Sequence, residues 1–226
     1  MRSKVTVSFM LMGILFSLCL VLSNILAVKQ FQILGFPSTA GLIIFPISYV
    51  INDCITEVWG FRKARLIIWI AFAVNFLAIL LFQISVALPP APHWTMQESY
   101  STVLAQTPRI ALASLLAFLV GSFLNAYVMS KMKILHKGKK FGQRAIASTI
   151  VGELADTFVF TTVGFLFVIP LNVVIQIIFV ETIAKTLFEI LVLPVTRRVV
   201  NYVKQVEGTD VYDDDISYSV IKVRDI

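Results

Sequence analysis

Two carboxylates stand four residues apart inside an apolar stretch of the chain. Asp53 and Glu57 lie within the run FPISYVINDCITEVWG at residues 45–60, and a spacing of four places both on one face of a helix. Tyr49 stands one turn earlier on that face, and Asn52 and Thr56 form the adjoining row. An ionisable group in hydrocarbon is costly unless it faces the protein interior or water. The pattern therefore predicts the polar wall of a ligand cavity.

Glu57 has a second interpretation. The stretch ends at Gly60 and is followed by the basic residues Arg62, Lys63 and Arg65. Glu57 is close to this basic end, so it could serve as a surface anchor that pairs with Arg62 or Arg65. Asp53 lies one turn deeper and fits that role less well.

A second polar stretch, at residues 144–157, repeats the four-residue spacing. Ser148, Gly152 and Asp156 fall on one helix face. Small residues on such a face let a neighbouring helix or a flat ligand approach closely. A packing stripe explains Ser148 and Gly152, but Asp156 requires a partner.

The last apolar stretch carries Glu181, Lys185 and Glu189 at i, i+4 and i+8. One interpretation is an internal ladder of ion pairs that neutralises itself. The other is that Lys185 pairs with an acid beside a ligand and changes partners during transport. Because acids outnumber the lysine, some carboxylate is left for a ligand or a proton.

Carboxylates and an amide, with aromatic rings nearby, suit a flat heterocycle that has several N–H donors. A carboxylate can accept two N–H groups side by side, and a guanine-like edge presents such a pair. An inorganic cation or an organic amine also fits the acids, so the residues alone leave these ligands open.

Composition identifies a membrane protein. Of 226 residues, 58% are hydrophobic and 14% charged, with a mean hydropathy of +0.87, whereas a soluble domain is about 25% charged. Cys19 and Cys54 lie in apolar segments, which argues against a disulfide framework. The net charge of +6 falls mostly in loops, where it reflects topology and not nucleic-acid binding.

Apolar stretches of about 17–25 residues are long enough to cross a bilayer. Six such stretches are predicted, at residues 7–28, 40–59, 66–88, 110–129, 147–169 and 173–195. The sequence thus predicts an all-α polytopic membrane protein with a six-span domain over residues 1–200 and an acidic, poorly ordered cytoplasmic tail over 201–226. The proline-rich segment at 88–94 must break a helix, and a short interfacial helix is expected to follow it.

Basic residues alternate between the loops. They gather at the amino terminus (Arg2 and Lys4), after the second and fourth stretches, and after the sixth, while the intervening loops are nearly uncharged. This pattern places both termini in the cytoplasm. Each half has three spans with a polar middle span, so if the halves are related they must be inverted in the membrane, and this 3+3 inverted repeat is a common transporter plan.

Several runs, taken together, resemble one family. SNILAVK at 23–29, FPISYVINDCITEVWG at 45–60, PRIALASLLAFLVG at 108–121, RAIASTIVGELADT at 144–157 and the pair Glu181 and Lys185 resemble the queuosine precursor transporter family, also described as a vitamin uptake transporter family. The resemblance extends from the first span to Arg198.

The resemblance implies a carrier of the bacterial inner membrane without a cofactor. It would import 7-cyano- or 7-aminomethyl-7-deazaguanine, the precursors of queuosine, by alternating access. The matching positions imply a site that contains Asn24, Asp53, Thr56, Ser148, Asp156 and Lys185, with an acid at Glu181. Asp53 and Asp156, one from each half, would bracket the ligand.

Two other classes of function are a protease and a subunit of an ATP-driven importer. A metal-dependent intramembrane protease needs clustered histidines, but His93 and His136 fall in loops on opposite sides. An aspartyl protease could use Asp53 and Asp156, yet its dipeptide contexts are absent. The chain could instead be the substrate-capture subunit of an ATP-driven importer, and since it has no Walker motif, partner subunits would supply ATP coupling. Proton or sodium coupling and a homodimer stay open.

Overall fold

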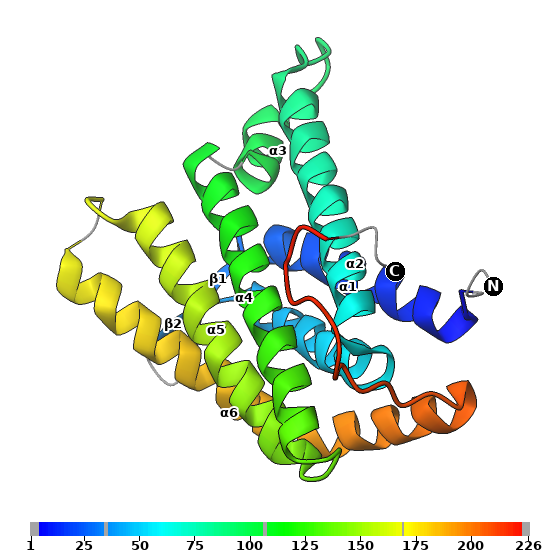
Figure 1. Ribbon diagram of the computed structural model, residues 1–226. Helices are drawn as coiled ribbons and strands as arrows, with labels where there is room; N and C mark the ends of the chain where they lie inside the picture. Colours follow the sequence, from blue (N-terminus) through cyan, green and yellow to red (C-terminus); the bar gives the residue numbers. More distant parts are fainter. Residues whose placement is uncertain (1–4, 34–35, 106–107, 169, 223–226) are drawn as a thin grey trace.

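The computed structural model describes residues 5–33, 36–105, 108–168 and 170–222. Most of these residues are helical, and the long helices pack side by side (Figure 1). In chain order the elements are α1 (Val7–Leu26), β1 (Gln30–Ile33), β2 (Phe36–Thr39), the 3-10 helix η1 (Ala40–Ile43), α2 (Phe45–Ala87), α3 (Gln97–Leu104), α4 (Pro108–Leu135), α5 (Phe141–Phe165) and α6 (Leu171–Glu207). The helical class predicted from the sequence is confirmed.

A small hairpin departs from the all-helical expectation. Strands β1 and β2 pair antiparallel, with Gln30 opposite Thr39 and Ile33 opposite Phe36. They occupy the uncharged loop after the first apolar stretch, for which the sequence predicts no strands.

Helix α2 contains two of the predicted apolar stretches. It runs for 43 residues, but Gly60 interrupts the helix with φ 81° and ψ 171°. This conformation is open almost only to glycine. Gly60 therefore divides α2 into segments 45–59 and 61–87, close to the predicted boundary between the second and third stretches.

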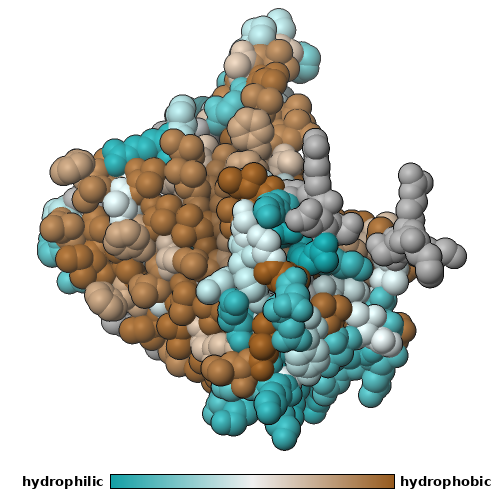
Figure 2. Space-filling model, in the orientation of Figure 1, coloured by the Kyte–Doolittle hydropathy of each residue, from teal (hydrophilic) through white to brown (hydrophobic). Residues whose placement is uncertain are grey.

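Within the described residues, four stretches are long and apolar enough to cross a membrane, and they fall in the ranges 7–26, 40–87, 97–135 and 141–165. The protein is therefore a multi-pass membrane protein. Helix α6 is 37 residues long but is not among these segments in the part of the chain that is described, and its apolar stretch carries Glu181, Lys185 and Glu189. Figure 2 shows a broad apolar surface over most of the visible face, while hydrophilic residues gather at one end. Arg2 and Lys4 lie outside the described residues.

The predicted helix break and short helix after α2 are both present. Helix α2 ends at Ala87 and α3 begins at Gln97. The Trp94 and Tyr100 rings meet edge to face, with 6.4 Å between centroids, and Tyr100 is hydrogen-bonded to Ser85 on α2. Helix α3 is thereby held against the end of α2.

Helices α4 and α5 approach each other through two glycines. A Cβ at Gly121 would lie 3.0 Å from the Gly152 carbonyl oxygen, and one at Gly152 would lie 2.9 Å from the Gly121 oxygen. No side chain fits between the two backbones at this point. Gly152 thus belongs to a packing stripe, and this contact brings Asp156 toward α4.

The carboxyl-terminal tail is ordered against the bundle, which corrects the expectation of a poorly ordered segment. Helix α6 continues to Glu207, and the chain then turns back across α4 and α2 (Figure 1). The Arg65 guanidinium donates to the carbonyl oxygens of Ser217 and Ser219 at 3.1 and 2.7 Å. The Trp69 indole N–H donates to the Val220 carbonyl at 2.8 Å.

Asp213 anchors the tail at the interruption in α2. Its carboxylate accepts the backbone N–H of Phe61 at 2.8 Å and the hydroxyl of Ser130 at 2.5 Å. Phe61 is the first residue after Gly60, so its N–H has no carbonyl of the preceding turn available. Asp213 acts as an N-cap supplied from 152 residues away in the chain.

Candidate functional site

Asp53 is fully buried, with 0% of its surface exposed. The Ser148 hydroxyl of α5 lies 3.4 Å from Asp53 Oδ1 and 2.9 Å from the Ala145 carbonyl oxygen, so its single proton is shared between these two acceptors. Asp53 Oδ2 has no hydrogen-bond partner among the described residues. The two predicted residues Asp53 and Ser148 are thus brought together, and one carboxylate oxygen is left free.

Asn52 connects the same segment to α4. Its amide nitrogen donates to Asn125 Oδ1 at 2.8 Å and to the Ser122 carbonyl at 3.1 Å. The remaining amide atoms, Asn52 Oδ1 and Asn125 Nδ2, have no hydrogen-bond partner within the described residues. Asn125 was absent from the predicted site, although an amide inside an apolar helix is a signal for such a contact.

Tyr49 is buried at the glycine contact. A Cβ at Gly152 would lie 3.0 Å from Tyr49 Cε1, and one at Gly121 would lie 2.6 Å from its hydroxyl oxygen. The hydroxyl has no hydrogen-bond partner in the described part of the chain. Phe45 packs on the Tyr49 ring, with 5.6 Å between centroids, so aromatic surface adjoins the polar wall.

Lys185 is the cationic centre of the second polar group. Its ammonium lies 3.0 Å from Glu153, 3.5 Å from Asp156 and 3.8 Å from Glu181, and 4.4 Å from the Phe45 ring centroid. The prediction that Lys185 pairs with an acid is confirmed. Three acids surround one cation, so the group as a whole is acidic.

Glu189 does not join this group, which corrects the predicted ladder of three residues along α6. It is buried with 1% exposed, and neither carboxylate oxygen has a hydrogen-bond partner among the residues described. Glu189 interacts electrostatically with Asp53. The predicted site does not contain Glu189.

The other predicted residues take different places. Asn24 donates to Asn75 at 2.9 Å and accepts from Ser114 at 3.1 Å, and no contact with Asp53 is seen in the described part of the chain. Thr56 is buried and donates to the Asn52 carbonyl of the preceding turn at 2.8 Å. The Glu181 side chain is 45% exposed and lies at the edge of the Lys185 group.

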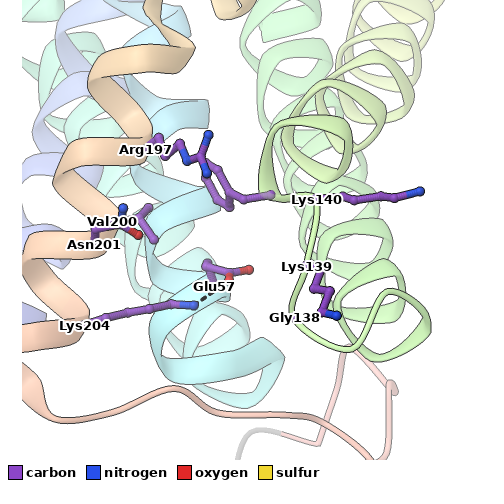
Figure 3. A pocket seen from close by; sticks show the side chains of 9 residues that line it. Glu57, Gly138, Lys139, Lys140, Arg197, Val200, Asn201 and Lys204 are labelled. Carbon is purple, nitrogen blue, oxygen red and sulfur yellow. Dashed lines mark hydrogen bonds and ion pairs between the residues drawn. The ribbon is translucent and has the colours of Figure 1, made fainter.

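Glu57 is a buried residue that forms ion pairs with three cations, and it is not a surface anchor. The Arg144 guanidinium, itself 0% exposed, binds both of its oxygens at 2.5 and 3.0 Å. Lys204 of α6 donates at 2.6 Å, and Lys133 of α4 lies 3.9 Å away. The expected partners Arg62 and Arg65 were therefore wrong. Figure 3 shows the bond between Lys204 and Glu57, and together these contacts tie four helices at one end of the bundle.

Asp210 extends this network into the tail. It accepts from Lys133 at 2.5 Å and from Lys204 at 2.8 Å. Partial burial acts to raise the pKa of Asp210, but the hydrogen bonds from both lysines outweigh it and hold the pKa below its ordinary value. The tail is thus bound through charge at Asp210 and through capping at Asp213.

Several buried polar atoms around Asp53 have no hydrogen-bond partner among the described residues and are therefore candidates for contacts with a ligand. Asp53, Asn52, Asn125, Tyr49 and Glu189 each retain at least one such atom. An unsatisfied buried polar group costs about 1–3 kcal/mol, so a concentration of them indicates an environment completed by a ligand, water or protons. No group of three or more His, Cys, Asp or Glu suited to a metal ion occurs in the part of the chain described.

Comparison with known families assigns the chain. A model of the family described as "putative vitamin uptake transporter" matches residues 39–199, a range that includes nearly all of the polar region. The chain belongs to this family.

Its relatives carry names of transporters, not of enzymes. It is 30% identical over 175 residues to the "Probable queuosine precursor transporter" of Bacillus subtilis, covering 77% of this chain and 76% of that protein. It is 29% identical to the "Queuosine precursor transporter" of Escherichia coli, covering 63% of this chain and 62% of that protein. It is 30% identical to the similarly named Haemophilus influenzae protein, covering 66% of this chain and 60% of that one. The last two are thus matched over less than two thirds of their length, and no solved structure matches.

Proposed function

We propose that this protein is a secondary-type transporter that imports 7-deazaguanine precursors of queuosine, the 7-cyano or 7-aminomethyl form, across the bacterial inner membrane. Its family and the printed names of its relatives support a membrane transporter of queuosine precursors. The choice of precursor and the transport mechanism go beyond those names.

The observation that carries the proposal is the free oxygen of Asp53. Among the described residues, no donor meets hydrogen-bond geometry at Oδ2 of this fully buried carboxylate, although the Ser148 hydroxyl and the Asn125 amide both lie close enough to act on it. A guanine-type edge offers a ring N–H beside an exocyclic amine, and a carboxylate accepts such donors. We assign Asp53 to reading this edge.

The neighbouring groups complement the same ligand. The Asn125 amide nitrogen, which acts on Asp53, could donate to a ring carbonyl instead, and Asn52 Oδ1 could accept an N–H group. Tyr49 provides a buried ring beside them. Asp156 already pairs with Lys185, so in the proposed mechanism it forms the second wall and exchanges partners when the ligand enters.

The proposed topology has six spans in two inverted halves, with both termini in the cytoplasm. The interruption at Gly60 supports counting α2 as two spans. Helices α1, α2, α4, α5 and α6 then provide three spans in each half, and Asp53 and Asp156 lie in the middle span of each. Alternating access would move these middle spans relative to each other around the ligand.

The test measures queuosine in transfer RNA in bacteria that cannot make its precursors and are fed either compound. Asp53→Asn and Asp156→Asn variants that are membrane-inserted at normal levels should leave queuosine at least about tenfold lower, since a hydrogen bond to a charged group contributes about 1.5–3 kcal/mol. Asp214→Asn, at an exposed position of the tail, is the matched control. Normal queuosine in both site variants would refute the assignment.

A further inference from the structure

A cavity of about 330 Å³ opens at the end of the bundle that carries the basic loops. It lies between the α4–α5 loop, the start of α5 and the last turns of α6 (Figure 3). The polar and charged side chains in its lining are Glu57, Lys139, Lys140, Arg197, Asn201 and Lys204. It is separate from the Asp53 region, which is not part of the lining.

The charge of this cavity is strongly positive. Glu57 is its single acidic lining residue, and Arg144 and Lys204 already neutralise it at 2.5 and 2.6 Å. Arg197, Lys139 and Lys140 are exposed, and no acidic partner of theirs is found in the described chain. These cations are therefore available to an anion.

The backbone adds to the positive potential. Helix α5 has 25 residues and begins next to the cavity, and its N-cap residue Lys140 makes no side-chain capping bond. The amino-terminal end of a helix carries partial positive charge. Figure 3 shows Arg197, Asn201 and Lys204 projecting from α6, and the Lys140 side chain extending away from them from the start of α5.

An apolar strip continues from the cavity along α6. Ile190 and Pro194 lie on the same helix face as Arg197, about two turns and one turn before it. Ile190 is 43% exposed, and Pro194 is also exposed. A lipid whose phosphate occupied the cavity could thus place its acyl chains against this apolar strip of α6.

We propose that this cavity binds a phosphate group, as presented by the headgroup of an anionic phospholipid. Basic pockets between membrane helices are suited to such headgroups. Free phosphate has the same charge chemistry, and the experiment separates these two sources.

The experiment measures the rise in thermal unfolding temperature of the purified full-length protein in neutral detergent. Dioleoyl phosphatidylglycerol is titrated against dioleoyl phosphatidylcholine, and inorganic phosphate against sodium chloride at equal ionic strength. The cavity variant is Lys140→Gln with Arg197→Gln. The control is Lys137→Gln with Arg198→Gln, which removes the same charge from exposed residues outside the lining. Lys137 and Lys140 both have positive φ, 49° and 57°, so backbone strain is matched.

Phosphatidylglycerol should stabilise the protein more than phosphatidylcholine. The concentration for half of the effect should rise about 30-fold in the cavity variant, since each of the two removed cations is expected to strengthen headgroup binding about fivefold. It should rise by less than about twofold in the control, because Lys137 and Arg198 do not line the cavity. A response to the lipid alone identifies a headgroup site, and a further response to phosphate that the cavity variant loses shows that the free anion also enters. The proposal is overturned if neither ligand stabilises the protein, or if both double variants weaken the response equally.

Discussion

At the residue scale, Lys185 is the cation that offsets part of the negative charge of the second polar group. One ammonium lies within 4 Å of Glu153, Asp156 and Glu181. Glu153 and Asp156 are buried, so without the lysine they would leave two uncompensated charges. The lysine therefore supports folding as well as any exchange of partners during transport.

Replacing Lys185 with Met should destabilise the protein by about 3–5 kcal/mol, because breaking a buried ion pair strands the remaining charges. Thermal unfolding of the purified protein in detergent measures this change. Lys222→Met, at an exposed tail position, should leave stability unchanged, and adding Glu153→Gln to Lys185→Met should recover part of the loss. A Lys185→Met protein as stable as the parent would contradict the described charge balance.

Site residues could be predicted from the sequence where burying their charged side chains in a membrane segment would cost free energy. Asp53, Asp156 and Lys185 stand out because ionisable groups are rare within membrane segments. Asn125 and Glu189 were missed, because helix periodicity does not say which helix a face will contact. The predicted partner of Glu57 was wrong for the same reason: Arg144 is 87 residues away, and Arg65, one of the two expected partners, binds the tail.

At the element scale, the contact between α4 and α5 sets the distance between the two polar walls. Gly121 and Gly152 each face the backbone carbonyl of the other. Tyr49 and Asp156 pack at the same point. Any added side chain must therefore move a helix and not only a neighbouring side chain.

Gly121→Ala should cost about 1–3 kcal/mol of stability through overpacking and reduce uptake. Gly164→Ala is the matched control on α5, since its added Cβ would meet only side-chain methyl groups, at 3.2 and 3.6 Å. Thermal unfolding and uptake of both variants provide the comparison. Equal effects at Gly121 and Gly164 would argue against a special role for the glycine contact.

The tail and the interruption in α2 form a second unit at this scale. Gly60 breaks the helix and Asp213 caps the segment that follows. The break was foreseeable from a glycine between an apolar stretch and a basic cluster. The tail contact was not, since a short acidic segment with mixed composition is typical of disordered ends.

Asp213→Ala should lower stability by about 1 kcal/mol through the lost cap and loosen the tail. Limited proteolysis should then cut within residues 208–222 faster than in the parent. Asp214→Ala removes the same charge one residue later, at an exposed position, and should change neither readout. Unaltered protection in Asp213→Ala would mean that the cap does not hold the tail.

At the scale of the whole molecule, the polar groups fall into two levels. Near one end, Glu57 ties α2, α4, α5 and α6 through Arg144, Lys133 and Lys204. Asp53 lies one helical turn from Glu57 along α2 and belongs to a separate group that retains unpartnered atoms. The carboxylate of Glu57 has partners on both oxygens, whereas the Asp53 group keeps polar atoms without partners among the described residues. This arrangement is expected when the Glu57 network holds the helices together and the Asp53 group binds a ligand.

The most direct measurement of the central claim is uptake of radiolabelled 7-cyano-7-deazaguanine by the purified protein alone in liposomes. Asp53→Asn is compared with Asp214→Asn at equal reconstitution, with substrate varied to separate affinity from rate. We expect uptake without partner subunits or ATP, normal values for Asp214→Asn, and at least about a tenfold lower uptake efficiency for Asp53→Asn. Uptake that required added ATP-driven subunits, or that was unaffected by Asp53→Asn, would contradict this expectation.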